Sequence, residues 1–122
     1  MIETVKVSEK AKIQLITLKR RTGIENWNVL CRWAFCTSIR EKKPLPNENI
    51  ITDSSIEMTW KTFAGNDEEL YLALLIQRAK QDGTELDKQS INHYFKLHLH
   101  RGISYLNNAN TQSIEKLLLL IN

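Results

Sequence analysis

The chain has 122 residues, of which 42% are hydrophobic, and this suits one domain with a single modest core rather than two domains. No run reaches the roughly 18 to 20 apolar residues that a membrane span needs, and residues 1–10 lack the apolar centre of a signal peptide, so we expect a cytoplasmic protein that does not contact a membrane. The formal net charge is +3, but residues 1–43 hold ten basic and four acidic side chains, whereas residues 44–122 hold seven and ten.

This uneven charge makes nucleic acid the first partner to consider, because clustered lysine and arginine side chains are typical of phosphate binding. A solvated basic face without a specific partner is the alternative, since net charge influences association rather than fold. The nucleic-acid interpretation requires that the cations of residues 1–43 form one exterior patch.

Residues 2–7 alternate like a half-buried strand, with Val5 and Val7 on one face and Thr4 and Lys6 on the other. A lone strand leaves its backbone groups without partners, and no other N-terminal segment offers a neighbour. We therefore expect this strand to pair with the same strand of a second subunit.

A first helix is predicted over residues 9–21, with Ser8 as its N-cap and Gly23 just beyond its end. Its inward stripe contains Ala11, Leu15 and Leu18, with Ile16 beside it. The last turn holds Lys19, Arg20 and Arg21, where cations also complement the helix dipole.

A second helix is predicted over residues 27–40, with Asn26 as its cap. Its apolar residues occur on nearly every side, so we expect surrounding protein, part of it supplied by a subunit interface. Arg32 lies in the middle of this helix, and a charge there needs a partner. We favour a structural ion pair over a ligand-binding role for this arginine.

The remainder is predicted as a loop followed by helices. Pro44 and Pro46 indicate a loop over residues 44–55. Residues 56–61 alternate like a strand, but Trp60, Phe63 and Ala64 also fit a helical stripe, and we favour a helix. Further helices are predicted over 70–80, from a cap at Thr84 or Asp87 to residue 106, and over 113–121. Gly102, on the inward stripe, predicts close helix contact.

The fold prediction is a mostly all-α single domain over residues 1–122 with a short N-terminal strand. It comprises a basic strand-helix-helix segment (1–43), which resembles half of a ribbon-helix-helix dimer, a loop (44–55) and a helical remainder (56–122).

Catalytic and metal chemistry find little support, and we expect neither an enzyme nor a cofactor. His98 and His100 point to opposite sides of a helix, and only His93 and His100 share a face, without a further ligand to complete a metal site. Cys31 and Cys36, five residues apart on a helix, are too distant for an unstrained disulfide. Their apolar neighbours predict buried thiols rather than reactive thiolates.

The order strand, helix, glycine-containing turn and helix is typical of ribbon-helix-helix proteins, in which two subunits build a ribbon for the major groove. Thr4 and Lys6 would face DNA, but few other side chains could contact base edges. Backbone binding with weak sequence preference and strong salt dependence is therefore favoured. A ribbon-helix-helix repressor and a cysteine-dependent sulfur carrier are the alternatives.

Four segments carry a family resemblance, namely LCRWAFC (30–36), MTWKTF (58–63), YLALL (71–75) and FKLHLHRGI (95–103). In these, and in order and length, the chain resembles the DndE family, the small subunit of the bacterial system that replaces a non-bridging phosphate oxygen of DNA with sulfur. The resemblance implies a non-catalytic homotetramer that binds duplex DNA and favours nicks. It also implies action beside a cysteine desulfurase, a sulfurtransferase and an ATPase.

The family's DNA contacts are attributed to surface lysines, and it has no settled catalytic motif. The resemblance therefore implies contacts drawn from Lys6, Lys10, Lys12, Lys19, Lys42 and Lys43. The charge pattern adds Arg20 and Arg21 to this set.

Overall fold

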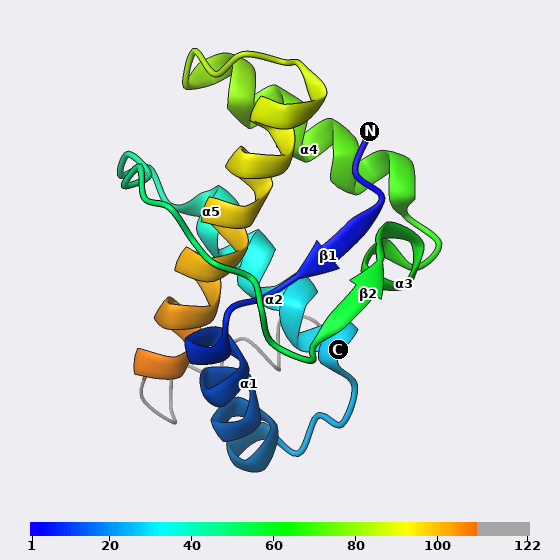
Figure 1. The fold of residues 1–122 in the computed structure, drawn as a ribbon, viewed down its shortest axis with the longest axis vertical. Coiled ribbons are helices and arrows are strands. Elements are labelled where there is room, and N and C mark those ends of the chain that lie inside the picture. Colours follow the sequence, from blue (N-terminus) through cyan, green and yellow to red (C-terminus); the bar gives the residue numbers. More distant parts are fainter. Residues whose placement is uncertain (110–122) are drawn as a thin grey trace.

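Two helices, α2 (Trp27–Arg40) and α5 (Lys88–Asn108), pack against each other at the centre of the fold (Figure 1). The computed structural model describes residues 1–109. Around this pair lie the elements α1 (Glu9–Thr22), α3 (Trp60–Ala64), α4 (Glu68–Gln81), β1 (Thr4–Lys6) and β2 (Glu57–Thr59). The mostly helical fold with an N-terminal strand is thus confirmed, whereas the helix predicted over 113–121 lies outside the described residues.

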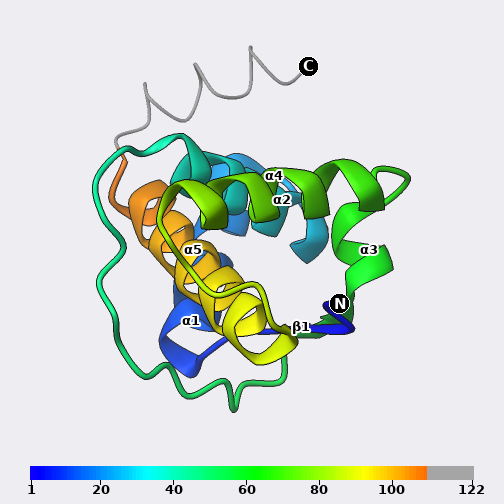
Figure 2. The ribbon, with the colours of Figure 1, turned by 90° about the horizontal axis from the view of Figure 1, so that it is seen from above.

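The long segment between α2 and β2 contains no helix or strand, which agrees with the loop predicted over 44–55. Seen from above, it passes around one side of the helix pair, and α3 lies on the other (Figure 2). Within residues 1–109, none of the helices combines the length and the apolar content that crossing a bilayer requires.

The core forms where α2 and α5 approach most closely. A Cβ atom on Gly102 would overlap the backbone of Ala34, so the predicted close contact at this glycine is confirmed. Beside it, aromatic side chains pack edge to face, with ring centroids 5.9 Å apart for Phe35 and Phe63 and 5.2 Å apart for Phe63 and Phe95. The close approach at Gly102 therefore sets the short distance between α2 and α5.

The N-terminal strand finds its partner within the same chain. β1 pairs antiparallel with β2, in the register Thr4 with Thr59, Val5 with Met58 and Lys6 with Glu57. The prediction that a second subunit supplies the partner strand was therefore wrong, as was the helix favoured for residues 57–59. Both errors have one cause, because the three-residue strand β2 leads directly into the helical residues that dominate the pattern.

Local signals placed the first two helices correctly. The Ser8 hydroxyl accepts a hydrogen bond from the Ala11 N–H at 3.0 Å, and Gly23 has a φ of 76° at the C-cap of α1. The predicted inward stripe of Ala11, Leu15 and Leu18 is buried, and Ile16 beside it is 46% exposed. The chain itself buries the apolar centre of α2, and no second subunit is needed to cover it.

Four arginines donate hydrogen bonds to backbone carbonyl groups. Arg32 reaches Phe63 O at 2.8 Å, and among the described residues it has no ion-pair partner, so the predicted ion pair was wrong. The other contacts lie at helix ends or just beyond them: Arg78 with Ile39 O (2.6 Å), Arg101 with Ser38 O and with Lys43 O in the following loop (2.8 Å each), and Arg21 with Asn107 O (2.9 Å) and Ala109 O (2.7 Å). Such contacts satisfy carbonyls that a helix leaves without partners.

Candidate nucleic-acid interface

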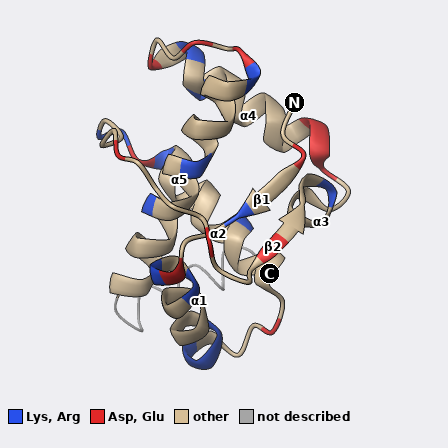
Figure 3. Cartoon of the chain, viewed as in Figure 1, with Lys and Arg blue, Asp and Glu red and all other residues tan. Residues whose placement is uncertain are grey.

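The cations predicted to bind DNA lie in separate places (Figure 3). Lys6 lies on β1, residues 19–21 form the far end of α1, and residues 42–43 lie on the loop after α2. The 14 residues of α1 alone separate its two ends by roughly 20 Å. The cations expected to form a single exterior patch are therefore divided among three segments of the fold.

Several of these cations already have contacts within the chain. The Arg21 guanidinium holds the carbonyls at the end of α5, and the Lys19 ammonium lies 4.9 Å from the centre of the Trp27 ring. Lys12 Nζ donates to Ser55 Oγ at 2.8 Å. Lys10, Arg20, Lys42 and Lys43 are exposed. Some of the predicted DNA-binding cations are therefore engaged in contacts within the chain, and others face solvent.

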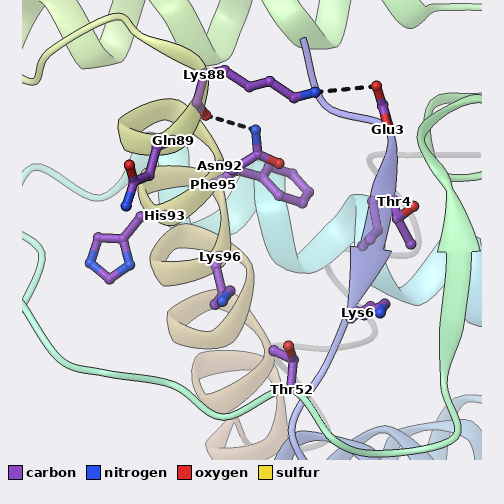
Figure 4. Close-up of a pocket in the computed structure, with 11 residues that line it drawn as sticks. Glu3, Thr4, Lys6, Thr52, Lys88, Gln89, Asn92, His93, Phe95 and Lys96 are labelled. Atoms are coloured by element: carbon purple, nitrogen blue, oxygen red, sulfur yellow. Dashed lines mark hydrogen bonds and ion pairs between the residues drawn. The ribbon is translucent and has the colours of Figure 1, made fainter.

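A groove between β1 and the first half of α5 brings together three lysines from two elements that are far apart in the sequence (Figure 4). We call it the β1–α5 groove, and its volume is about 770 Å³. Lys6 extends from β1, while Lys88 and Lys96 extend from α5. The other polar side chains that line it are Glu3, Thr4, Thr52, Gln89, Asn92 and His93.

The floor of the groove is buried, whereas Lys6 and Lys88 are exposed and Lys96 is partly exposed. Val5 and Phe95, which line the bottom, are 1% and 4% exposed and belong to the core. Lys88 Nζ lies 3.2 Å from Glu3 Oε1, and Lys6 Nζ lies 3.9 Å from Glu57 Oε1. Both pairs are exposed to solvent and therefore weak. Among the described residues, Lys96 forms no ion pair.

His100 connects the groove to the start of α1. Its Nε2 accepts a hydrogen bond from the Ser8 N–H at 3.1 Å, so Nδ1 carries the proton and donates to the carbonyl of Lys96 at 2.8 Å. Burial lowers the pKa of His100, which keeps the ring neutral and suits this pair of contacts. The side chain thereby fixes the turn of α5 that carries Lys96.

His98 is also buried, but its role is structural. Its Nδ1 lies 2.7 Å from the hydroxyl of Ser38, which accepts a further hydrogen bond from Arg101 Nε at 2.8 Å. Burial, followed by the charge of Arg101, lowers the pKa of His98 to about 3. The neutral ring joins α5 to the last turn of α2.

Neither metal nor sulfur chemistry finds a favourable geometry among residues 1–109. His93 lies at the edge of the groove and contacts Asn47, while His100 is buried, and no three potential ligands cluster. Burial raises the pKa of the Cys31 thiol to about 12, and that of Cys36 is also raised, chiefly by burial. A thiol held in its protonated form is a poor nucleophile.

The sequence reasoning missed the basic residues of α5, because it followed the charge excess of residues 1–43. Lys88 and Lys96 belong to the half of the chain that is net acidic. Their spacing carried a usable signal, since residues 88, 92 and 96 lie at intervals of four and share one face of a helix. That this face lies beside Lys6 is seen only in the folded structure.

Comparison with known proteins agrees with this fold. The family model for the DNA sulphur modification protein DndE matches residues 4–113. A crystal structure of DndE from Escherichia coli B7A, involved in DNA phosphorothioation modification, has a TM-score of 0.73 and 22% identity, and the match covers 87% of this chain and 98% of that one. A DndE mutant involved in DNA phosphorothioation has a TM-score of 0.69 and 20% identity, with coverages of 89% and 100%. No curated protein matches the sequence.

Proposed function

Because this chain belongs to the DndE family of DNA sulphur modification proteins, we propose that it holds duplex DNA during phosphorothioation without catalysing sulfur transfer itself. Family membership makes it a component of DNA phosphorothioation. The finer proposal concerns how it takes part, and the β1–α5 groove is the observation that carries it.

The groove suits the DNA backbone better than the base edges. Lys6 and Lys96 extend from different elements on two sides of one recess, so both can approach the same stretch of backbone (Figure 4). A lysine ammonium binds phosphate as a point charge and carries little sequence information. Binding should therefore be similar for all sequences and should weaken steeply as salt increases.

A non-catalytic role is supported by the state of the two thiols, which burial keeps protonated. The sulfur-carrier alternative would need at least one exposed thiolate. The ribbon-helix-helix alternative would need a strand shared between subunits. The pairing of β1 with β2 inside one chain favours the backbone-binding proposal over that class.

Self-association belongs to the same proposal, and the resemblance suggests a homotetramer. Ile13 and Ile16, one turn apart on α1, are 62% and 46% exposed and offer an apolar contact face. Light scattering on the native chain and on an Ile13→Ser, Ile16→Ser variant tests this. The variant should have a lower mass with an unchanged circular dichroism spectrum, and an unchanged mass would remove this face from the proposal.

The DNA-binding proposal is tested by fluorescence anisotropy with intact and nicked duplexes of several sequences, at roughly 50 to 200 mM salt. A Lys6→Gln, Lys96→Gln variant should bind about tenfold or more weakly on every sequence, and its salt slope should fall by about two. The matched control is Lys61→Gln, Lys80→Gln, which removes the same charge from exposed sites on α3 and α4. A native chain that binds no duplex, or equal losses in both variants, would overturn the proposal.

We also propose that the chain prefers nicked duplexes and contacts other proteins of the phosphorothioation system. Comparing the anisotropy of intact and nicked duplexes measures the nick preference directly. A cysteine desulfurase, a sulfurtransferase and an ATPase are the expected partners, and pull-down with each purified partner would identify which of them contacts this chain.

A further inference from the structure

Two of the three lysines of the β1–α5 groove already face an acidic side chain. Lys88 pairs with Glu3 (dashed line in Figure 4), with Nζ 3.2 Å from Oε1, and Lys6 Nζ lies 3.9 Å from Glu57 Oε1. A phosphate that bound either lysine would have to displace the paired carboxylate or lie beside its negative charge. Lys96 has no such neighbour among the described residues.

The fold holds both carboxylates at these places. Lys6 and Glu57 are directly paired residues in the antiparallel register of β1 and β2. The carbonyl of Glu3 accepts a hydrogen bond from the Trp60 N–H at 2.9 Å, which fixes its backbone at the end of the sheet. Both acidic side chains therefore stay within reach of their lysines whether or not DNA is present.

Lys88 is the first residue of α5 and follows the N-cap Asp87, whose side chain accepts a hydrogen bond from the Ser90 N–H at 3.1 Å. A cation at a helix N-terminus is disfavoured by the helix dipole, whereas an anion beside it is favoured. The Asp87 carboxylate already provides this negative charge at the end of the helix, so Glu3 acts on Lys88 as a separate ion-pair partner, and it is this contact that a DNA phosphate could replace.

We infer that Glu3 and Glu57 compete with DNA phosphate for Lys88 and Lys6, and thereby set the affinity and salt dependence of the groove. This inference rests on the proposed DNA-binding function. DNA would displace a carboxylate at two of the lysines and would bind Lys96 without displacing one. Each displaced carboxylate takes up a cation, which offsets part of the counterion release that drives binding. The isolated subunit would then bind DNA weakly and release it readily.

The test uses Glu3→Gln and Glu57→Gln in the full chain, with Glu25→Gln and Glu69→Gln as controls. All four sites are exposed, and each substitution adds the same net charge. Relative to the controls, each groove variant should bind duplex DNA about two- to fivefold more tightly, which is the range for an exposed ion pair. Its salt slope should also steepen by up to about one.

A second experiment tests whether the tighter DNA binding depends on the ion pairs. In a Lys88→Gln background, Glu3→Gln should give no more gain than the controls, because the lysine for which it competes is absent. Gains equal to those of the controls, or a gain from Glu3→Gln that persists without Lys88, would overturn the inference.

The two proposals fail in different ways. A native chain that binds DNA through Lys6 and Lys96, but whose glutamate variants match the controls, refutes only the competition. A native chain that binds no DNA refutes the proposed function itself. Thermal unfolding of each variant confirms that it is folded.

Discussion

Gly102 of α5 lies so close to Ala34 of α2 that a Cβ atom on the glycine would overlap the alanine carbonyl group. Because the obstacle is backbone, no side-chain rotation can relieve it, and Gly102→Ala should lower the free energy of unfolding by about 3 kcal/mol. Urea denaturation measures this. Gln89→Ala, at an exposed position of the same helix, serves as the control, and equal midpoints for the two variants would refute the prediction.

Ser38→Ala should destabilise the fold by about 2 kcal/mol, because it removes the partner of both Arg101 Nε and His98 Nδ1 in a buried site. Urea denaturation of this variant is compared with that of Ser104→Ala. The hydroxyl of Ser104 accepts only a long hydrogen bond, from Gln14 at 3.4 Å, so its loss should have little effect. Similar stability losses in both variants would count against the network.

Stability should fall as the pH drops from about 6.5 towards 4. The pKa of His98 is lowered from 6.5 to about 3 in the folded chain, so between these values the unfolded state binds more protons. Stability therefore rises with pH in this window, by up to about 1 kcal/mol per pH unit from His98. The lowered pKa of His100 acts in the same direction. Denaturation of native and His98→Asn chains across this range should show a flatter dependence in the variant, and parallel curves would exclude His98 as the cause.

Arg21→Ala should weaken the fold by about 1 kcal/mol and leave DNA affinity nearly unchanged, because this guanidinium caps the end of α5. Lys96→Gln should show the reverse, with weaker DNA binding and unchanged stability. Thermal unfolding and anisotropy on both variants separate the two roles. A loss of DNA binding in Arg21→Ala at full stability would return this arginine to the DNA-binding set.

Cys31 should react very slowly with thiol reagents in the folded chain. A pKa raised from 9.0 to about 12 implies roughly a thousandfold less thiolate at neutral pH. Labelling of a Cys36→Ser variant, before and after unfolding in urea, isolates this thiol. Rapid labelling of the folded variant would revive the sulfur-carrier alternative.

Helix positions could be predicted because their signals are local. Ser8, Gly23 and Asp87 cap helices through contacts within a few residues, and the structure places them as expected. The partner of β1 could not be predicted in the same way, since it lies some fifty residues further along the chain. Three residues of strand also carry too little alternation to outweigh the helical stripe that follows.

The candidate site was harder to predict than the fold. Charge counted along the chain pointed to residues 1–43, but of the cations in this segment only Lys6 lines the β1–α5 groove. Its other cations come from α5, because a groove depends on which elements become neighbours rather than on which segment is basic. The same limit explains Arg21, whose charge suggested DNA although its contacts are with the helix end beside it.

The arginine contacts within this fold also bear on how the chain could contact the base edges of DNA. Four of its six arginines hold main-chain oxygens in place, and Arg20 and Arg40 are the other two. Paired hydrogen bonds from arginine are the commonest means by which proteins identify guanine. With four of its six arginines occupied in this way, few forked donors remain for base edges, which is consistent with the proposed contact to the DNA backbone.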